Sequence, residues 1–168
     1  MTPLPPPLGP GALILWRLDQ AKHAPAWDSG EGGYLAGGRW NSRGVCAVYA
    51  SLDPATAILE VAVHKTFQTL DTVPHVLTSA PIIDASGAHV VQAADAPNPN
   101  WLLPGAPSAG QQAFGDALLK AHTFVVIPSV VSRHSWNVIF DPAMAAGLYG
   151  PPQQEAFALD PRLHPPEP

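Results

Sequence analysis

Residues 45–67 read VCAVYASLDPATAILEVAVHKTF, and this segment shows where a strand ends and a helix begins. Residues 45–51 form a short, mostly apolar run, which predicts a buried strand. Asp53 then supplies a helix N-cap, and Pro54 suits the first helical position. We therefore expect a helix over residues 54–67. Its apolar residues lie nearly all round, which predicts a helix that is buried on most sides.

The segment before this one combines a strand with a long loop. Residues 12–18 are apolar and are bounded by proline, glycine and Asp19, so they predict a buried strand with Arg17 near its end. Residues 19–44 contain six glycines and few aliphatic residues, which is typical of an ordered loop used for binding. The five prolines in residues 1–11 favour an extended tail.

The second half of the chain predicts one more helix and several strands. Residues 109–122 have a helical pattern, and a proline-broken loop precedes them at 95–108. Turns are expected at 84–87 and 132–135, and the second should join a pair of strands. The expected strands are residues 76–78, 88–92, 123–131, 136–140 and 155–160. Strands outnumber helices and do not alternate with them, which indicates an α+β fold with a mixed, mostly antiparallel sheet and a few flanking helices.

Composition limits the class of protein. The 168 residues, 46% of them hydrophobic, suffice for one domain, which we expect over residues 12–163 between proline-rich tails at 1–11 and 164–168. The net charge of −5, without a run of bases, argues against nucleic acid as a partner. A single cysteine, Cys46, and the lack of a signal-peptide or membrane-span pattern favour a cytoplasmic protein. The histidines show no metal-ligand spacing, so no metal site is predicted.

The sequence GGRWN at residues 37–41 is the first candidate site. Two glycines let the backbone approach a ligand closely, and Arg39 beside Trp40 pairs a forked anion binder with a flat stacking surface. The alternative is structural: the arginine binds loop carbonyls, and the tryptophan lies in the core. Composition does not decide between the two.

Glu60 and Ser129 each have two interpretations as well. An ionised carboxylate inside an apolar helix needs a partner or a ligand, so Glu60 forms a structural pair with Arg17 or Arg39, or is held ready for a cationic sugar intermediate. An arginine pair would keep the carboxylate ionised, so both can hold together. The Ser129 hydroxyl either satisfies backbone groups at an irregular strand or points into a cleft.

Taken together, these segments resemble the RES domain family over most of residues 13–163. The matching segments follow in family order: WRL at 16–18, GGRWN at 37–41, VYAS at 48–51, the helix segment 57–64 with Glu60, IPS at 127–129, Asn137, and FALDPR at 157–162. The resemblance implies a fold similar to ADP-ribosyltransferases. It also implies a toxin of a bacterial Xre–RES toxin–antitoxin pair, which consumes NAD+ by hydrolysis, by phosphorolysis or by ADP-ribosylating a protein.

The resemblance also implies roles for eight residues and a partner. The catalytic residues it implies are Arg39, Tyr49, Glu60 and Ser129. The ligand-binding residues it implies are Arg17, Trp40, Asn41 and Asn137. NAD+ is then the substrate, with no metal, and the partner is an Xre-like antitoxin with a helix-turn-helix that blocks the cleft.

The chemistry of NAD+ agrees with these residue types. Nicotinamide leaves as a neutral ring, so the bond to ribose breaks without a general acid, and one carboxylate is enough to face the oxocarbenium-like ribose. Glu60 would do this, the arginines would hold the pyrophosphate, Tyr49 or Trp40 would stack on a ring, and Ser129 would fix a polar group of the nicotinamide riboside half. The acceptor stays open between water, phosphate and a protein. A non-catalytic module that senses nucleotides or binds proteins is the alternative function, and a ribonuclease is disfavoured by the acidic charge.

Overall fold

The structure is a computed structural model that describes residues 11–167. Its strands are β1 (Ile14–Gln20), β2 (Val48–Ser51), β3 (His75–Pro81), β4 (Ala88–Val90), β5 (Phe124–Pro128), β6 (Trp136–Phe140) and β7 (Gln153–Phe157). Its helices are α1 (Glu31–Ala36), α2 (Pro54–Thr72) and α3 (Ala109–Ala121), with short 3-10 helices η1 (Ala21–Ala26), η2 (Ala93–Asp95) and η3 (Pro161–Leu163). Most of the expected N-terminal tail, and Pro168, lie outside the described residues.

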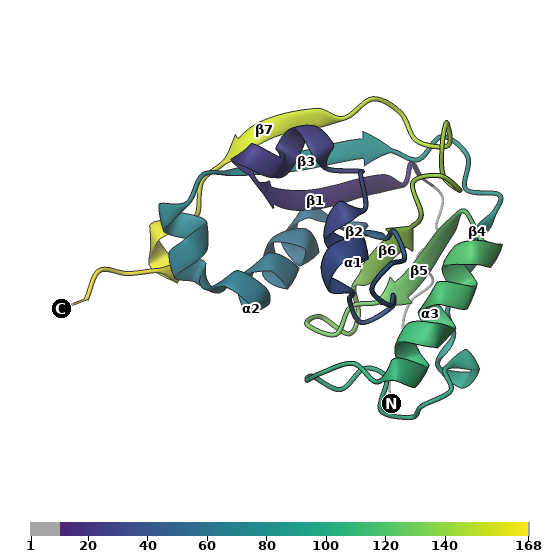
Figure 1. The fold of residues 1–168 in the computed structure, drawn as a ribbon. Helices are drawn as coiled ribbons and strands as arrows, with labels where there is room; N and C mark the ends of the chain where they lie inside the picture. The colour runs from purple at the N-terminus through teal and green to yellow at the C-terminus, as the bar shows by residue number, and fades with distance from the viewer. Residues whose placement is uncertain (1–10, 168) are drawn as a thin grey trace.

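The seven strands form one sheet in the order β4-β5-β6-β2-β1-β3-β7 (Figure 1). Only the edge pair β4 and β5 is parallel, and the other neighbours are antiparallel. The α+β fold class with a mostly antiparallel sheet is therefore confirmed. The expected pairing across residues 132–135 is also confirmed, because β5 and β6 are antiparallel neighbours with Ile127 opposite Asn137.

Some elements differ from the sequence prediction. The loop expected over residues 19–44 contains η1 and α1. The strands on either side of the turn near 84–87 do not meet, because β3 pairs with β1 and β7, whereas β4 pairs with β5 near the opposite edge of the sheet. The last strand begins at Gln153 and ends at Phe157, earlier than expected. The pairing of strands distant in sequence depends on tertiary packing, and local patterns do not reveal it.

Helix α2 begins as the sequence predicts. The Asp53 side chain accepts a hydrogen bond from the Thr56 backbone N–H at 2.8 Å, and Pro54 occupies the first turn. The prediction that this helix is buried on most sides was wrong, because Leu59 and Val63 are 36% and 56% exposed. One face packs on the sheet, and these two apolar side chains instead line a cleft.

The backbone of α2 is interrupted at Thr66, where φ is 72° and ψ is 155°. This conformation is almost exclusive to glycine, and a β-branched residue there costs about 1–3 kcal/mol. The helical hydrogen bonding resumes beyond this residue and continues to Thr72.

A Thr66→Gly substitution is therefore expected to stabilise the protein. The strain it removes exceeds the roughly 0.5–1 kcal/mol that glycine loses in backbone entropy, so we expect a gain of about 1 kcal/mol and a rise in Tm of about 2–4 °C. Gln68→Gly, two residues further on in regular helix, should lower Tm instead. Thermal unfolding of both variants checks this, and a lower Tm for Thr66→Gly would show that the residue is not strained.

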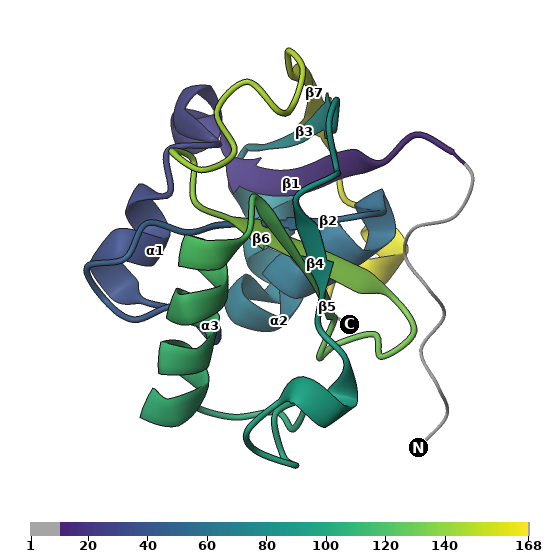
Figure 2. The same cartoon turned by 90° about the vertical axis from the view of Figure 1, so that its right-hand side faces the viewer.

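One face of the sheet carries a core that includes Leu15, Val48, Phe124 and Phe140, and α2 and α3 both cover the opposite face. Helix α3 packs beside β5 through Leu119 and the partly buried Phe114 and Leu118 (Figure 2). Helix α2 covers the other end of the sheet, where Ala62 and Leu70 pack against Leu18 and Leu77. None of the helices within residues 11–167 is long and apolar enough to span a bilayer.

Candidate active site

The cleft opens where β1 and β2 separate. Strand β1 pairs with β3 along all seven of its residues, but with β2 only through Trp16 opposite Ser51. Just beyond that pair, Arg17 Nη1 donates a hydrogen bond to the Tyr49 carbonyl oxygen at 2.8 Å, so a side chain joins the two strands. The cleft has a volume of about 1460 Å³ and extends from η1 and α1 past α2 to the loop before α3.

Six of the eight predicted site residues line this one cleft: Arg17, Arg39, Trp40, Tyr49, Glu60 and Asn137. The remaining two, Asn41 and Ser129, are fully buried. Asn41 contacts Tyr49, and Ser129 contacts Glu60, so each lies directly behind a residue of the cleft. The structure thus brings the eight residues together, but it places these two where they position other side chains.

Glu60 is held by two donors from the β5–β6 end of the sheet. Its Oε1 accepts a hydrogen bond from Ser129 Oγ at 2.8 Å and another from Asn137 Nδ2 at 2.5 Å. Asn137 Oδ1 in turn accepts from Ser51 Oγ at 2.7 Å. Because Ser51 lies directly opposite Asn137 in the β2–β6 ladder, strand pairing sets this contact. Sequence reasoning missed Ser51, which only the register of those strands reveals.

The Ser129 hydroxyl satisfies a backbone group, as one of its two interpretations predicted, but it contacts Glu60 from behind and does not line the cleft. It accepts a hydrogen bond from the Ser132 backbone N–H at 3.1 Å and donates its own hydrogen to Glu60. The backbone N–H also orients the hydroxyl, so the donor is aimed at the carboxylate before any ligand arrives. This makes Ser129 a positioning residue for Glu60.

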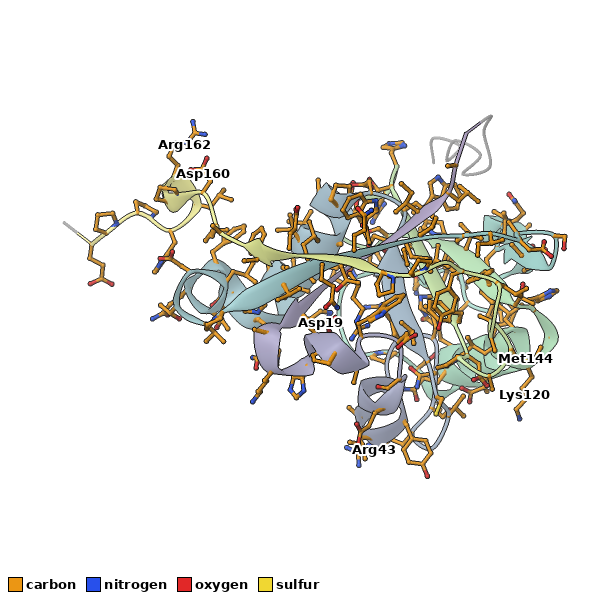
Figure 3. All side chains as sticks on the ribbon, turned by 90° about the horizontal axis from the view of Figure 1, so that it is seen from above. Asp19, Arg43, Lys120, Met144, Asp160 and Arg162 are labelled. Carbon is orange, nitrogen blue, oxygen red and sulfur yellow. The ribbon has the colours of Figure 1, made fainter. Side chains whose placement is uncertain are left out.

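The structural ion pair expected for Glu60 is not present among the described residues. Arg17 instead pairs with Asp19, through Nε at 2.9 Å to Oδ2 and through Nη2 at 2.9 Å to Oδ1. Asp19 lies toward the middle of the molecule, with 9% of its side chain exposed (Figure 3). It lies two residues from Arg17 on the same face of β1, a spacing from which the pair could have been anticipated.

Arg39 and Trp40 make the contacts of their structural interpretation. Arg39 donates to the carbonyl oxygens of Leu103 at 3.2 Å and Gly105 at 2.9 Å. Trp40 is 2% exposed and packs edge-on against Trp101, with ring centroids 5.5 Å apart. Arg39 nevertheless lines the cleft, and the two carbonyls use only two of its five N–H donors.

Tyr49 organises the segment that carries Arg39. Its hydroxyl donates to Asn41 Oδ1 at 2.7 Å and accepts from the Trp40 backbone N–H at 3.0 Å. Burial raises the pKa of the Tyr49 hydroxyl well above its ordinary value, so the group stays protonated. Gly38 is needed here, because a Cβ at this position would lie 2.5 Å from the Tyr49 oxygen.

The charge of the cleft is opposite to that of the whole chain. Half of the eight lysines and arginines line it, but only three of the thirteen acids do. One of these acids, Asp19, is neutralised by Arg17. A local excess of positive charge in an acidic protein favours an anionic ligand. Within residues 11–167, no group of three or more histidine, cysteine, aspartate or glutamate side chains could hold a metal ion.

Comparisons with known proteins show the family and the fold. The family model described as RES domain matches residues 14–160. Toxin Res of Photorhabdus laumondii is 32% identical over 132 residues, which are 77% of this chain and 82% of the relative. Toxin Res of Pseudomonas putida is 29% identical over 155 residues, which are 90% of this chain and 99% of the relative. The crystal structure of the M. tuberculosis MbcT–MbcA toxin–antitoxin complex contains a chain with the same fold, at a TM-score of 0.70 and 18% identity, covering 88% of this chain and 85% of that one.

Proposed function

Because the chain belongs to the RES domain family, we propose that it is the toxin of a bacterial toxin–antitoxin pair and that it breaks the bond between nicotinamide and ribose in NAD+. The observation that carries this proposal is the carboxylate of Glu60, held on one oxygen by Ser129 and Asn137 at a cleft with excess positive charge. This arrangement suits a substrate that combines an anionic diphosphate with a ribose that becomes positively charged.

The reaction needs little proton transfer at the leaving group. As the C1′–N bond breaks, its electron pair goes to the ring nitrogen, and nicotinamide departs neutral. Glu60 stabilises the positive charge that develops on the ribose, because a fixed carboxylate in a partly desolvated cleft acts without reorganisation. An acceptor oxygen then forms a bond to C1′ and loses its proton.

The remaining residues bind and position. Arg39 keeps three N–H donors for a phosphate group, and Tyr49 contributes a neutral ring to the cleft wall. Asn137 holds Glu60 while lining the cleft itself. Trp40 and Asn41, expected to bind ligand, are instead assigned to holding the Arg39 segment, because their side chains are buried within the protein.

Incubation of the purified chain with NAD+ labelled in the adenosine half tests this function. Release of nicotinamide is the expected result, and the labelled product identifies the acceptor: free ADP-ribose for water, phosphorylated ADP-ribose for phosphate, and labelled protein for transfer in cell extract. These three products correspond to the three proposed activities: NAD+ glycohydrolase, NAD+ phosphorylase and ADP-ribosyltransferase. Binding of NAD+ without nicotinamide release would instead identify a nucleotide-sensing module.

The partner we propose is an antitoxin of the Xre type, with a helix-turn-helix, acting in the cytoplasm. The similarity to a toxin–antitoxin complex supports an antitoxin, and the exposed Leu59 and Val63 beside Glu60 offer an apolar rim for it. A carboxylate inserted by the partner would meet Arg17 or Arg39 and exclude NAD+. Expression of the chain with and without its neighbouring gene, with growth and cellular NAD+ followed, tests this assignment.

A further inference from the structure

The cleft has a basic end that the proposed reaction leaves without a role. We define this basic end by five residues that line the cleft: Lys22, His23, His64, Lys65 and His75. The carboxylate nearest in sequence, Asp19, is already paired with Arg17. Neither lysine forms an ion pair within residues 11–167.

Strand pairing brings three of these residues to one corner of the sheet. His75 begins β3 and lies opposite Gln20, the last residue of β1. Helix η1 follows β1 directly and carries Lys22 and His23, and the Ala21 backbone N–H donates to the Pro74 carbonyl at 2.9 Å. The end of β1 and the start of β3 therefore hold η1 against His75.

Helix α2 reaches the same corner. Leu18 lies opposite Leu77, and this pair is the nearest neighbour of the Gln20–His75 pair on the same face of the sheet. Leu18 and Leu77 pack against Ala62 and Leu70 of α2. His64 and Lys65 lie between these two helix residues in sequence, and Figures 1 and 3 show η1 and the C-terminal part of α2 at the same end of the sheet. The strained Thr66 directly follows Lys65, and strained backbone concentrates at functional sites.

His75 supplies a polar atom to this corner. The side chain is 3% exposed, and its Nδ1 is 2.6 Å from the Val73 carbonyl oxygen. A carbonyl oxygen only accepts, so Nδ1 carries the hydrogen and Nε2 is left for the cleft that the residue lines. Nε2 has no hydrogen-bond partner among the described residues. An imidazole nitrogen without a protein partner, on a residue that lines the cleft, is available to a ligand.

We infer that the basic end is a phosphate-binding subsite of the cleft. Two lysines supply charge-assisted N–H donors, and phosphate oxygens are their natural partners. His75 Nε2 accepts from a phosphate oxygen that carries a proton. The phosphate belongs either to the dinucleotide, as its diphosphate or a 2′-phosphate, or to free inorganic phosphate. The inference rests on the proposed function only for the identity of the nucleotide.

Titration calorimetry with three probes at constant ionic strength tests this subsite: inorganic phosphate, NAD+ and NADP+. All proteins carry Glu60→Gln, so that any turnover of the probes is slow during the titration. A Lys22→Gln/Lys65→Gln protein is expected to bind at least one probe about tenfold more weakly or worse, as the loss of a charge-assisted hydrogen bond predicts. His75→Asn keeps a donor for the Val73 carbonyl but lacks Nε2, and the same loss is expected. Lys120→Gln is the matched control, since Lys120 lies on α3, exposed and outside the cleft (Figure 3).

The pattern of losses identifies the source of the phosphate. A loss for inorganic phosphate indicates a site for the free ion, a loss for NADP+ alone indicates the 2′-phosphate, and a loss for both nucleotides indicates the diphosphate. The inference would be overturned if both variants bound all three probes with unchanged affinity. It would also be overturned if the Glu60→Gln protein with Lys22, Lys65 and His75 intact bound none of the probes. Because this experiment measures binding and not turnover, the result is separate from nicotinamide release, which tests the proposed function.

Discussion

A Glu60→Gln variant is expected to release nicotinamide from NAD+ at least about a hundredfold more slowly than the unaltered chain, because loss of a few kcal/mol of electrostatic stabilisation has that effect on rate. The substitution removes the charge and little else. The glutamine Oε1 can still accept from Ser129 Oγ and Asn137 Nδ2, which are the two hydrogen bonds that hold Glu60. The fold and the affinity for the uncharged parts of the substrate should therefore persist.

Steady-state nicotinamide release and thermal unfolding, measured on the same preparation, check this prediction. Glu31→Gln is the matched control, because Glu31 is an acid on α1 that lines the same cleft, whereas the hydrogen bonds of the Glu60 carboxylate are to Ser129 and Asn137. Its rate should remain near that of the unaltered chain. A folded Glu60→Gln protein with nearly unaltered turnover would contradict the role we assign to this carboxylate.

The second large effect is expected from Gly115→Ala. This substitution adds a single methyl group at a residue that does not line the cleft. A Cβ on Gly115 would lie 1.9 Å from the Trp40 carbonyl oxygen and 2.5 Å from its carbonyl carbon. Both are backbone atoms, so α3 or the Arg39–Trp40 segment must move. We expect a destabilisation of about 3 kcal/mol, which outweighs the roughly 1 kcal/mol that alanine gains in helix propensity.

Gly110→Ala on the same helix separates the clash from propensity. A Cβ there has only the Ser108 side-chain oxygen within 4 Å, at 3.9 Å, so this variant should be neutral or more stable by up to about 1 kcal/mol. Denaturant unfolding of both proteins measures the difference. Equal stabilities would show that the helix and the Trp40 backbone are not in tight contact.

Local features of the fold followed from the sequence because neighbouring residues decide them. Asp53 and Pro54 predicted the start of α2, and the cap hydrogen bond spans only three residues. The β5–β6 pair was likewise predicted from two apolar runs joined by a short turn. The parallel pairing of β4 with β5 was not, since α3 and a long loop separate the two strands in sequence.

The candidate site divides in the same way. Motif resemblance selected eight residues, and six of them line one cleft. Their contacts were predicted less well: Arg17 meets Asp19 rather than Glu60, and Asn41 lies in the interior behind Tyr49. Residue type indicates which chemistry a side chain offers, but the direction in which it points depends on packing from several elements.

The sequence by itself determined the fold class, the capped start of α2 and the β5–β6 pair, and it singled out Glu60 as the candidate carboxylate. Only the tertiary structure decided what holds that carboxylate. Ser129 and Asn137 lie 69 and 77 residues from Glu60 along the chain, and they reach it because strand order and register place both beside α2. Caps and turns depend on contacts within a few residues, whereas a partner so distant is chosen by burial of the whole core.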